Sequence, residues 1–273
     1  MKINRNELVL EKLSKSYGEK RALNRVSFSF HAGLYGILGP NGAGKSTMMN
    51  LITDNLKPTE GRVLYNGKEI TSLGKGYLTK LGYIPQQEGF YNAFSGRMFL
   101  SYMAEMKGIP RKQANAQIEE ILERVNLQAD AHRKISEYSG GMQKRLMLGQ
   151  ALLGDPRILL LDEPTAGLDP VERIRLRNYI HELSRDRIIL FTTHIVSDIQ
   201  EIADQVLMMK DGRIVKSGPI PRILQEIREE ALENGRSELL PDSRKEVCLG
   251  KNHDGMTLEQ AYLYVMGGSM EDD

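Results

Sequence analysis

Cysteine, tryptophan and long apolar runs are scarce or absent in this chain of 273 residues. The single Cys excludes an intramolecular disulfide and is typical of a reducing compartment. No stretch reaches the run of about 18 apolar residues that suggests a membrane-spanning helix, and residues 1–7 lack the apolar core of a signal peptide. We therefore expect a cytoplasmic chain that does not cross a membrane itself.

An excess of charge of one sign is also lacking, because 37 basic residues balance 36 acidic ones. The net charge of +1 gives no electrostatic field for nucleic acid or acidic lipid, so no nucleic-acid partner is expected. Hydrophobic content of 40% and charged content of 27% are typical of a soluble globular protein. A zinc site is not expected, since no ligand spacing relates the residues His31, His132, His181, His253 and Cys248.

A glycine-rich segment is present between two regular elements. Residues 34–38 are apolar and predict a buried strand, and residues 46–56 predict a helix. The segment that joins the two elements and enters the predicted helix reads Gly39, Pro40, Asn41, Gly42, Ala43, Gly44, Lys45, Ser46 and Thr47. Its glycines would let backbone N–H groups form an anion nest at the helix N-terminus. Lys45 would reach the β- and γ-phosphates, and the Ser46 hydroxyl would bind Mg²⁺. A chance glycine-rich turn is the alternative, and the strand–helix context argues against it.

Two acidic residues follow the apolar run at residues 158–161, which predicts a strand buried on both faces of a parallel sheet. Asp162 would lie at the carboxyl end of that strand, where open α/β sheets bind ligands, and would hold Mg²⁺ through water. Glu163 would act as the general base for a water directed at the γ-phosphate. An acidic helix cap is the alternative interpretation, and the phosphate loop upstream favours the functional one.

A second glycine-rich segment precedes another predicted helix and reads Ser139, Gly140, Gly141, Met142 and Gln143. It would provide a second set of phosphate contacts at a helix N-terminus. Since one nucleotide needs one such cradle, we expect the chain to close around its nucleotide by pairing with another subunit.

In these motifs, their order and their spacing, the chain resembles the nucleotide-binding subunits of ATP-binding cassette (ABC) transporters over about residues 7–216. The resemblance implies that Gln86 contacts Mg²⁺ and that residues 166–169 form the D-loop. It also implies that His194 contacts the γ-phosphate and that Tyr17 stacks on adenine. Packing in the core is the alternative for Tyr17, and a structural role is the alternative for His194. In the family, Ser139, Gly140 and Gly141 would serve the ATP of the opposite subunit.

Two departures from the family pattern concern the signature segment and the D-loop. Tyr138 and Met142 replace the usual Leu and Gln of the signature, and Met142 lacks the amide hydrogen bonds of Gln. Ala166 and Gly167 replace the usual Ser-Ala, which removes a hydroxyl from the D-loop. We expect weaker communication between the two sites and no loss of hydrolysis.

The organisation expected is an α/β fold: a P-loop NTPase core with a mostly parallel sheet, an antiparallel β subdomain and an α-helical subdomain. Residues 7–32 and 61–72 predict the antiparallel strands, and residues 87–154 predict the helical subdomain. The ATPase domain would span residues 1–218 and a C-terminal accessory region residues 219–273. That region begins with a helix and continues as a polar, glycine-containing stretch to its end. Two helical stripes are expected to be buried: Ile118, Ile121, Leu122 and Val125, and Leu176, Tyr179, Ile180 and Leu183. On the helix of the second stripe, Arg173, Arg175 and Arg177 are expected to face solvent.

The function implied is an ATPase that uses ATP and Mg²⁺ to drive a separate transmembrane permease from the inner face of the cell membrane. Its second nucleotide-binding subunit would make a homodimer or a heterodimer. The amino-acid sequence as a whole resembles that of bacterial export-type cassettes. One alternative is a soluble ABC ATPase that remodels ribosomes or nucleic-acid complexes. Another is a small-molecule kinase, which would have no need of Ser139, Gly140 and Gly141.

Overall fold

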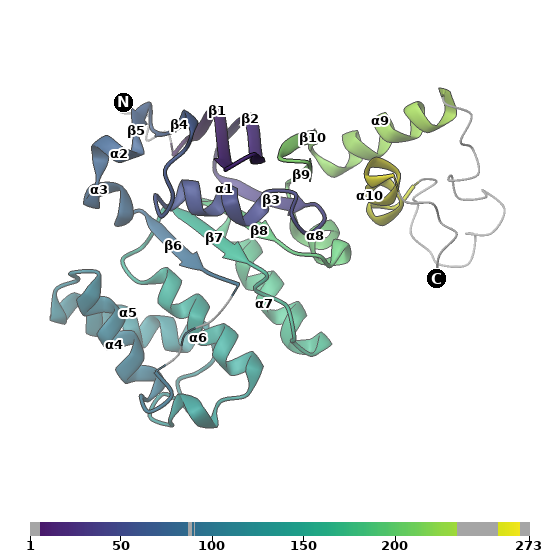
Figure 1. Cartoon of the computed structure of the whole chain (residues 1–273). Helices are drawn as coiled ribbons and strands as arrows, with labels where there is room; N and C mark the ends of the chain where they lie inside the picture. Colours follow the sequence, from purple (N-terminus) through teal and green to yellow (C-terminus); the bar gives the residue numbers. More distant parts are fainter. Residues whose placement is uncertain (1–5, 87–88, 90, 234–255, 268–273) are drawn as a thin grey trace, which may run out of the picture.

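The protein is described by a computed structural model over residues 6–86, 89, 91–233 and 256–267. Two β-sheets and a set of helices make up this part of the chain (Figure 1). The expected α/β class is confirmed, with a mostly parallel sheet, an antiparallel sheet and helices beside them. No helix within these ranges is both long and apolar enough to cross a membrane.

The larger sheet contains six strands: β3 (Gly33–Leu38), β6 (Leu81–Ile84), β7 (Ile158–Asp162), β8 (Ile188–Thr192), β9 (Gln205–Lys210) and β10 (Arg213–Gly218). Their spatial order is β10-β9-β3-β8-β7-β6, and β10 alone runs antiparallel to its neighbour. All residues of β7 and β8 are buried, as the uninterrupted apolar runs predict for central parallel strands. Asp211 and Gly212, both at positive φ, make the hairpin between β9 and β10.

The smaller sheet is antiparallel and contains β1 (Leu8–Tyr17), β2 (Lys20–Phe30), β4 (Glu60–Tyr65) and β5 (Lys68–Glu69). Helix α1 (Lys45–Ile52) packs with apolar residues of both sheets through Met48, Met49, Leu51 and Ile52. It ends before residue 56, the predicted end, and the left-handed backbone of Asp54 (φ 60°) follows. The predicted strand region likewise ends early, since residue 70 begins α2 (Ile70–Leu73), which α3 (Lys75–Leu78) follows.

Helices dominate the part of the chain between β6 and β7. They are α4 (Gly96–Met106), α5 (Arg111–Arg124), the 3₁₀ helix η1 (Ile135–Glu137) and α6 (Gly140–Leu152). The predicted stripe of α5 and the residue that follows it is buried at Ile118, Ile121, Leu122 and Val125. In Figure 1 these helices lie together in the lower half, away from α1. The predicted start of this subdomain, residue 87, lies outside the described residues.

Helix α7 (Pro170–Leu183) packs beside α8 (Val196–Ile202). Its predicted stripe is confirmed at Leu176, Ile180 and Leu183, which are buried, and Tyr179 is partly buried. The prediction that its arginines face solvent is wrong for Arg177, whose side chain is 13% exposed and pairs with a buried carboxylate. A helix contacted on more than one side buries positions outside its main apolar stripe, and an arginine there needs an acidic partner.

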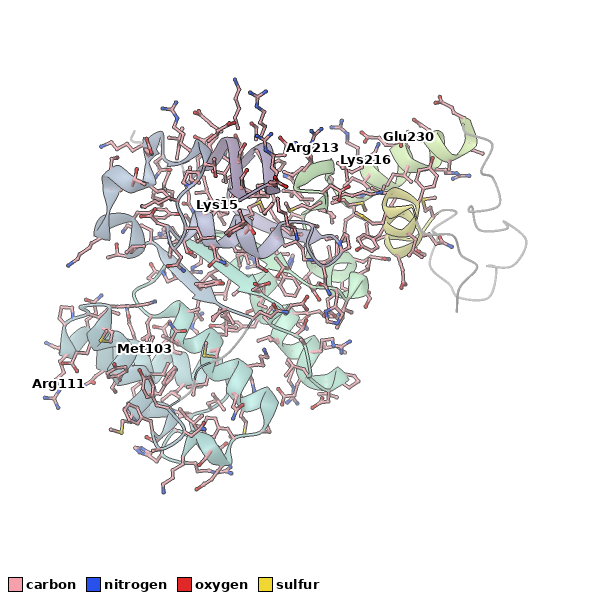
Figure 2. All side chains as sticks on the ribbon, in the orientation of Figure 1. Lys15, Met103, Arg111, Arg213, Lys216 and Glu230 are labelled. Carbon is pink, nitrogen blue, oxygen red and sulfur yellow. The ribbon has the colours of Figure 1, made fainter. Side chains whose placement is uncertain are left out.

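The C-terminal region contains α9 (Ile220–Glu233) and α10 (Leu258–Met266), which lie beside β9 and β10 (Figure 1). Figure 2 labels Lys216 and Glu230, the ion pair that joins β10 to α9. The side chain of Lys210 donates to the carbonyl of Met266 at 3.1 Å. The prediction of a polar stretch after α9 is wrong for α10, which a capping box at Thr257 and Gln260 begins. His253 and Cys248 lie outside the described residues.

Candidate functional site

The phosphate loop predicted from the sequence connects the end of β3 to the start of α1. Close packing requires glycine at two of its positions: a Cβ on Gly39 would lie 2.5 Å from the carbonyl oxygen of Met209, and one on Gly44 2.6 Å from that of Ala22. Gly44 also has a φ of 103°, which L side chains rarely adopt. The loop is therefore held tightly against the protein on one side, and Gly42 has open space around it.

The N-terminus of α1 provides the electrostatic component of this loop. Its N-cap residue, Gly44, makes no side-chain capping bond, and the first turn of α1 contains no acidic residue. The partial positive charge of the helix end is therefore not neutralised from within the helix. An anion bound in the loop would meet this end together with the exposed Ser46.

Lys45 lies over the loop and faces the two acidic residues at the carboxyl end of β7, Asp162 and Glu163. Its Nζ donates to the carbonyl oxygens of Gly39 and Pro40, the latter at 3.1 Å. Burial lowers the pKa of Lys45, and the charges of Glu163 and Asp162 oppose that shift. The structure thus brings together the three charged residues that the sequence predicts for one site.

The two carboxylates differ in their partners. Asp162 is 4% exposed and accepts a hydrogen bond from the Thr192 hydroxyl. Glu163 is 9% exposed, and its Oε2 lies 2.8 Å from Nδ1 of His194. Glu163 also has a φ of 54°, an uncommon backbone conformation for a residue with a side chain. The amide N–H of Glu163 donates to the carbonyl of Thr192, which helps to hold that conformation.

The carboxyl ends of neighbouring parallel strands bring these groups to one edge of the sheet. Thr192 pairs in register with Asp162 on β7 and with Ile37 on β3, one residue before that strand ends. His194 follows β8 by two residues, and its side chain is 70% exposed. Gln86 follows β6 at the same edge and is exposed. This is the edge where open α/β sheets bind ligands.

Tyr17 lies at the end of β1, and 49% of its surface is exposed. The Nζ atom of Lys15 lies over its ring, 5.5 Å from the ring centroid. The alternative of a core residue is therefore wrong, and the exposed ring remains a candidate for stacking on a base.

The second cradle is built at the start of α6. Ser139 is the N-cap, and its Oγ accepts from the amide N–H of Met142 at 3.2 Å. A Cβ on Gly140 would meet nothing within 4 Å, and one on Gly141 would lie 3.3 Å from Glu172 of α7. This cradle does not lie beside the first one, since α6 belongs to the helices in the lower half of Figure 1 and α1 lies apart from them.

The two residues that depart from the family signature have structural roles here. Tyr138 is 6% exposed, and its hydroxyl donates to the carbonyl of Asp130 at 2.8 Å. Met142 is partly buried and packs against the apolar core that contains α6. Both positions therefore help to fix the start of α6.

Sequence reasoning missed three residues that surround the site: Thr165, Arg177 and Asp198. Asp198 is fully buried and bonds to both of the others. These three residues lie far apart in the sequence, so no local pattern predicts that they contact one another. The nearest signal was the closeness of Thr165 to Glu163 and of Asp198 to His194 along the chain.

Comparison with known proteins gives consistent matches. A protein-family model for the ABC transporter matches residues 23–166. The ABC transporter ATP-binding protein YxlF of Bacillus subtilis, named as uncharacterised, is 37% identical over 222 residues, which are 80% of this chain and 73% of the relative. The bacitracin transport ATP-binding protein BcrA of Bacillus licheniformis is 33% identical over 244 residues, which are 88% of this chain and 77% of the relative.

A solved structure extends the likeness to three dimensions. It is a dimeric ATP-binding cassette in a post-hydrolysis state, bound to ADP and inorganic phosphate. The TM-score is 0.69 at 26% sequence identity, and the match covers 78% of this chain and 98% of that cassette.

Proposed function

This chain belongs to the ABC transporter family, and we propose that it is the ATP-hydrolysing subunit that drives a separate membrane permease. The family hydrolyses ATP, and its cassettes bind the nucleotide. The observation that carries the proposal is the meeting of the phosphate loop, Asp162, Glu163 and His194 at one edge of the parallel sheet. The sequence alternatives, a remodelling ATPase and a kinase, receive no support from the relatives.

Each residue of this edge receives a role from its position. The loop from Gly39 to Thr47 would hold the phosphates, with Lys45 as its cation against the β- and γ-phosphates. Glu163 would accept the proton of the attacking water, and His194 would contact the γ-phosphate from its exposed position beside Glu163. Tyr17 would stack on adenine at the end of β1.

Magnesium fits the oxygen-bearing side chains of the same edge. In the part of the chain that the structure describes, no group of three or more His, Cys, Asp and Glu forms a metal cage. Mg²⁺ usually binds through one or two carboxylates, waters and phosphate oxygens, so it does not need such a cage. Asp162, the Ser46 hydroxyl and the Gln86 amide would hold it, and it would neutralise phosphate charge.

Removing the cation of the loop provides the first test of the nucleotide site. Lys45→Ala is expected to lower the affinity for ATP by about a hundredfold or more, because a charge-assisted contact to a triphosphate is lost. Titration calorimetry with purified protein measures the change. Lys112→Ala, at an exposed lysine of α5, is the control and should bind normally. Near-normal affinity in Lys45→Ala would contradict the site assignment.

Two such subunits would act together, as a homodimer or a heterodimer. The start of α6 presents Ser139 and two glycines at a helix N-terminus, away from the chain's own α1 (Figure 1). A second subunit would place this cradle on the γ-phosphate of its partner. The dimeric cassette bound to ADP and phosphate supports such pairing.

The surface that would contact the permease is an apolar row on α4. Met98 and Met106 are 53% and 68% exposed, and the partly buried Tyr102 lies between them at four-residue spacing. Tyr91 and Phe94 extend the row, with ring centroids 5.3 and 5.9 Å from that of Tyr102. Exposed apolar groups gathered in this way mark interaction surfaces. We place the subunit at the inner face of the cell membrane, with residues 1–218 as its ATPase domain and 219–273 as an accessory region.

Charging this row tests the docking proposal. Met98→Asp is expected to reduce recovery of the permease with the tagged subunit from detergent-solubilised membranes by about tenfold, because a desolvated carboxylate opposes apolar contact. Leu232→Asp on α9 is the matched control, since Leu232 is also 53% exposed. Mass spectrometry identifies the recovered chains, and calorimetry checks that ATP affinity is retained. Recovery of ribosomal particles in place of a membrane protein would overturn the function, and equal recovery with Met98→Asp would overturn the surface.

A further inference from the structure

A fully buried carboxylate lies directly behind the catalytic edge. Asp198 of α8 is 0% exposed and uses both of its oxygens. Oδ2 accepts from the hydroxyl of Thr165 at 2.7 Å, and Oδ1 accepts from Nη1 of Arg177 at 3.0 Å. Thr165 is also 0% exposed, so the contact between Thr165 and Asp198 is removed from solvent.

The cluster joins the same two segments that carry Glu163 and His194. Thr165 follows Glu163 by two residues, and Asp198 follows His194 by four. The contact between Glu163 and His194 at 2.8 Å and the contact between Thr165 and Asp198 at 2.7 Å therefore connect these segments at successive points. The outer contact includes an exposed histidine, whereas the inner one is enclosed by protein.

Helix α7 fixes the inner contact in place. Arg177 neutralises Asp198, and one turn later Nδ1 of His181 contacts the carbonyl of Ile202 at the end of α8, at 3.1 Å. Helix α7 is thus joined to the short helix α8 near its start and at its end. A buried carboxylate with two partners is costly to remove from water and holds its geometry closely once both bonds are made.

We propose that Asp198, with Thr165 and Arg177, positions Glu163 against His194 for ATP hydrolysis. Thr165 ties the segment after Glu163 to α8, and α8 holds the loop that carries His194. Since Glu163 has an unusual left-handed backbone, its side chain depends on restraints from the residues around it. These are positioning residues, because neither Asp198 nor Thr165 reaches the solvent where a nucleotide would bind. The proposal rests on the proposed ATPase function.

A matched pair of substitutions at Thr165 tests this role. Thr165→Val keeps the shape of the side chain and removes the hydroxyl, and Thr165→Ser keeps the hydroxyl and removes a methyl group. Positioning predicts that Thr165→Val lowers kcat by about tenfold or more while KM and the affinity for a non-hydrolysable ATP analogue stay unchanged. Thr165→Ser should keep kcat within about twofold of the unchanged protein, since the bond to Asp198 persists.

A purely structural role predicts a different pattern. Both variants would then lose activity in proportion to the decrease in their melting temperatures. The proposal is overturned if Thr165→Val keeps full kcat, if Thr165→Ser loses as much as Thr165→Val, or if Thr165→Val does not fold. Failure of the proposed function is recognised separately. In that case the unchanged protein shows no ATP turnover, whereas failure of the positioning proposal leaves the turnover of the unchanged protein intact.

Discussion

Replacing Glu163 with Gln is expected to lower ATP turnover by about a thousandfold and to leave ATP binding intact. The amide is nearly the same size as the carboxylate but cannot accept the proton of the attacking water. In the structure, Glu163 is 9% exposed and is the carboxylate that contacts His194, whereas Asp162 is bound to the hydroxyl of Thr192. We therefore propose Glu163 as the base, because it lies between the sheet edge and the exposed histidine.

Two measurements on Glu163→Gln check this expectation. Phosphate release gives the turnover, and size-exclusion chromatography with ATP and Mg²⁺ gives the state of association. Because hydrolysis would release the pair, ATP should accumulate between two Glu163→Gln subunits and shift the protein to a dimer. Glu201→Gln, an exposed change on α8, serves as the control and should turn over ATP normally. Turnover of Glu163→Gln within a few-fold of the control would mean that another group is the base.

The sequence predicted which residues meet at the candidate catalytic edge because each part of that edge depends on the backbone. Gly39 and Gly44 are needed where the loop approaches other chain segments closely, and a strand that ends in a carboxylate brings that group to the ligand-binding edge. Such requirements leave fixed residue types at short, fixed spacings. The phosphate loop, the strand before Asp162 and the helix start at Ser139 could therefore be read directly.

The features that could not be predicted depend on contacts between distant segments. Asp198 and Arg177 each look like a solvent-facing position of a polar helix, and only the packing of α7 on α8 buries them together. Helix α10 is similar, because its apolar residues Leu258 and Ala261 gain their burial from the elements beside them. Local patterns do not report which surface a short helix will meet.

Replacing Ser139 with Arg is expected to leave ATP binding by single subunits nearly intact and to abolish ATP-dependent pairing and turnover. Ser139 lies at the exposed start of α6, and an arginine there would fill the space beside Gly140 with bulk. The change also removes the N-cap bond to Met142, which is worth about 1 kcal/mol. Ser139→Ala removes the same bond without added bulk, so it separates the cost of capping from the steric effect on pairing.

Mixing Ser139→Arg protein with Lys45→Ala protein decides whether the two cradles act in trans. In a mixed dimer, the intact Lys45 of one subunit faces the intact Ser139 of the other, and the second site carries both substitutions. Pairing or partial turnover that appears in the mixture, and in neither variant alone, requires a site shared between subunits. A mixture that stays inactive while the unchanged protein pairs readily means that both sites must work together or that the site is not shared. ATP binding by Ser139→Arg subunits separates these two outcomes, since its loss would place Ser139 in the nucleotide site of its own chain.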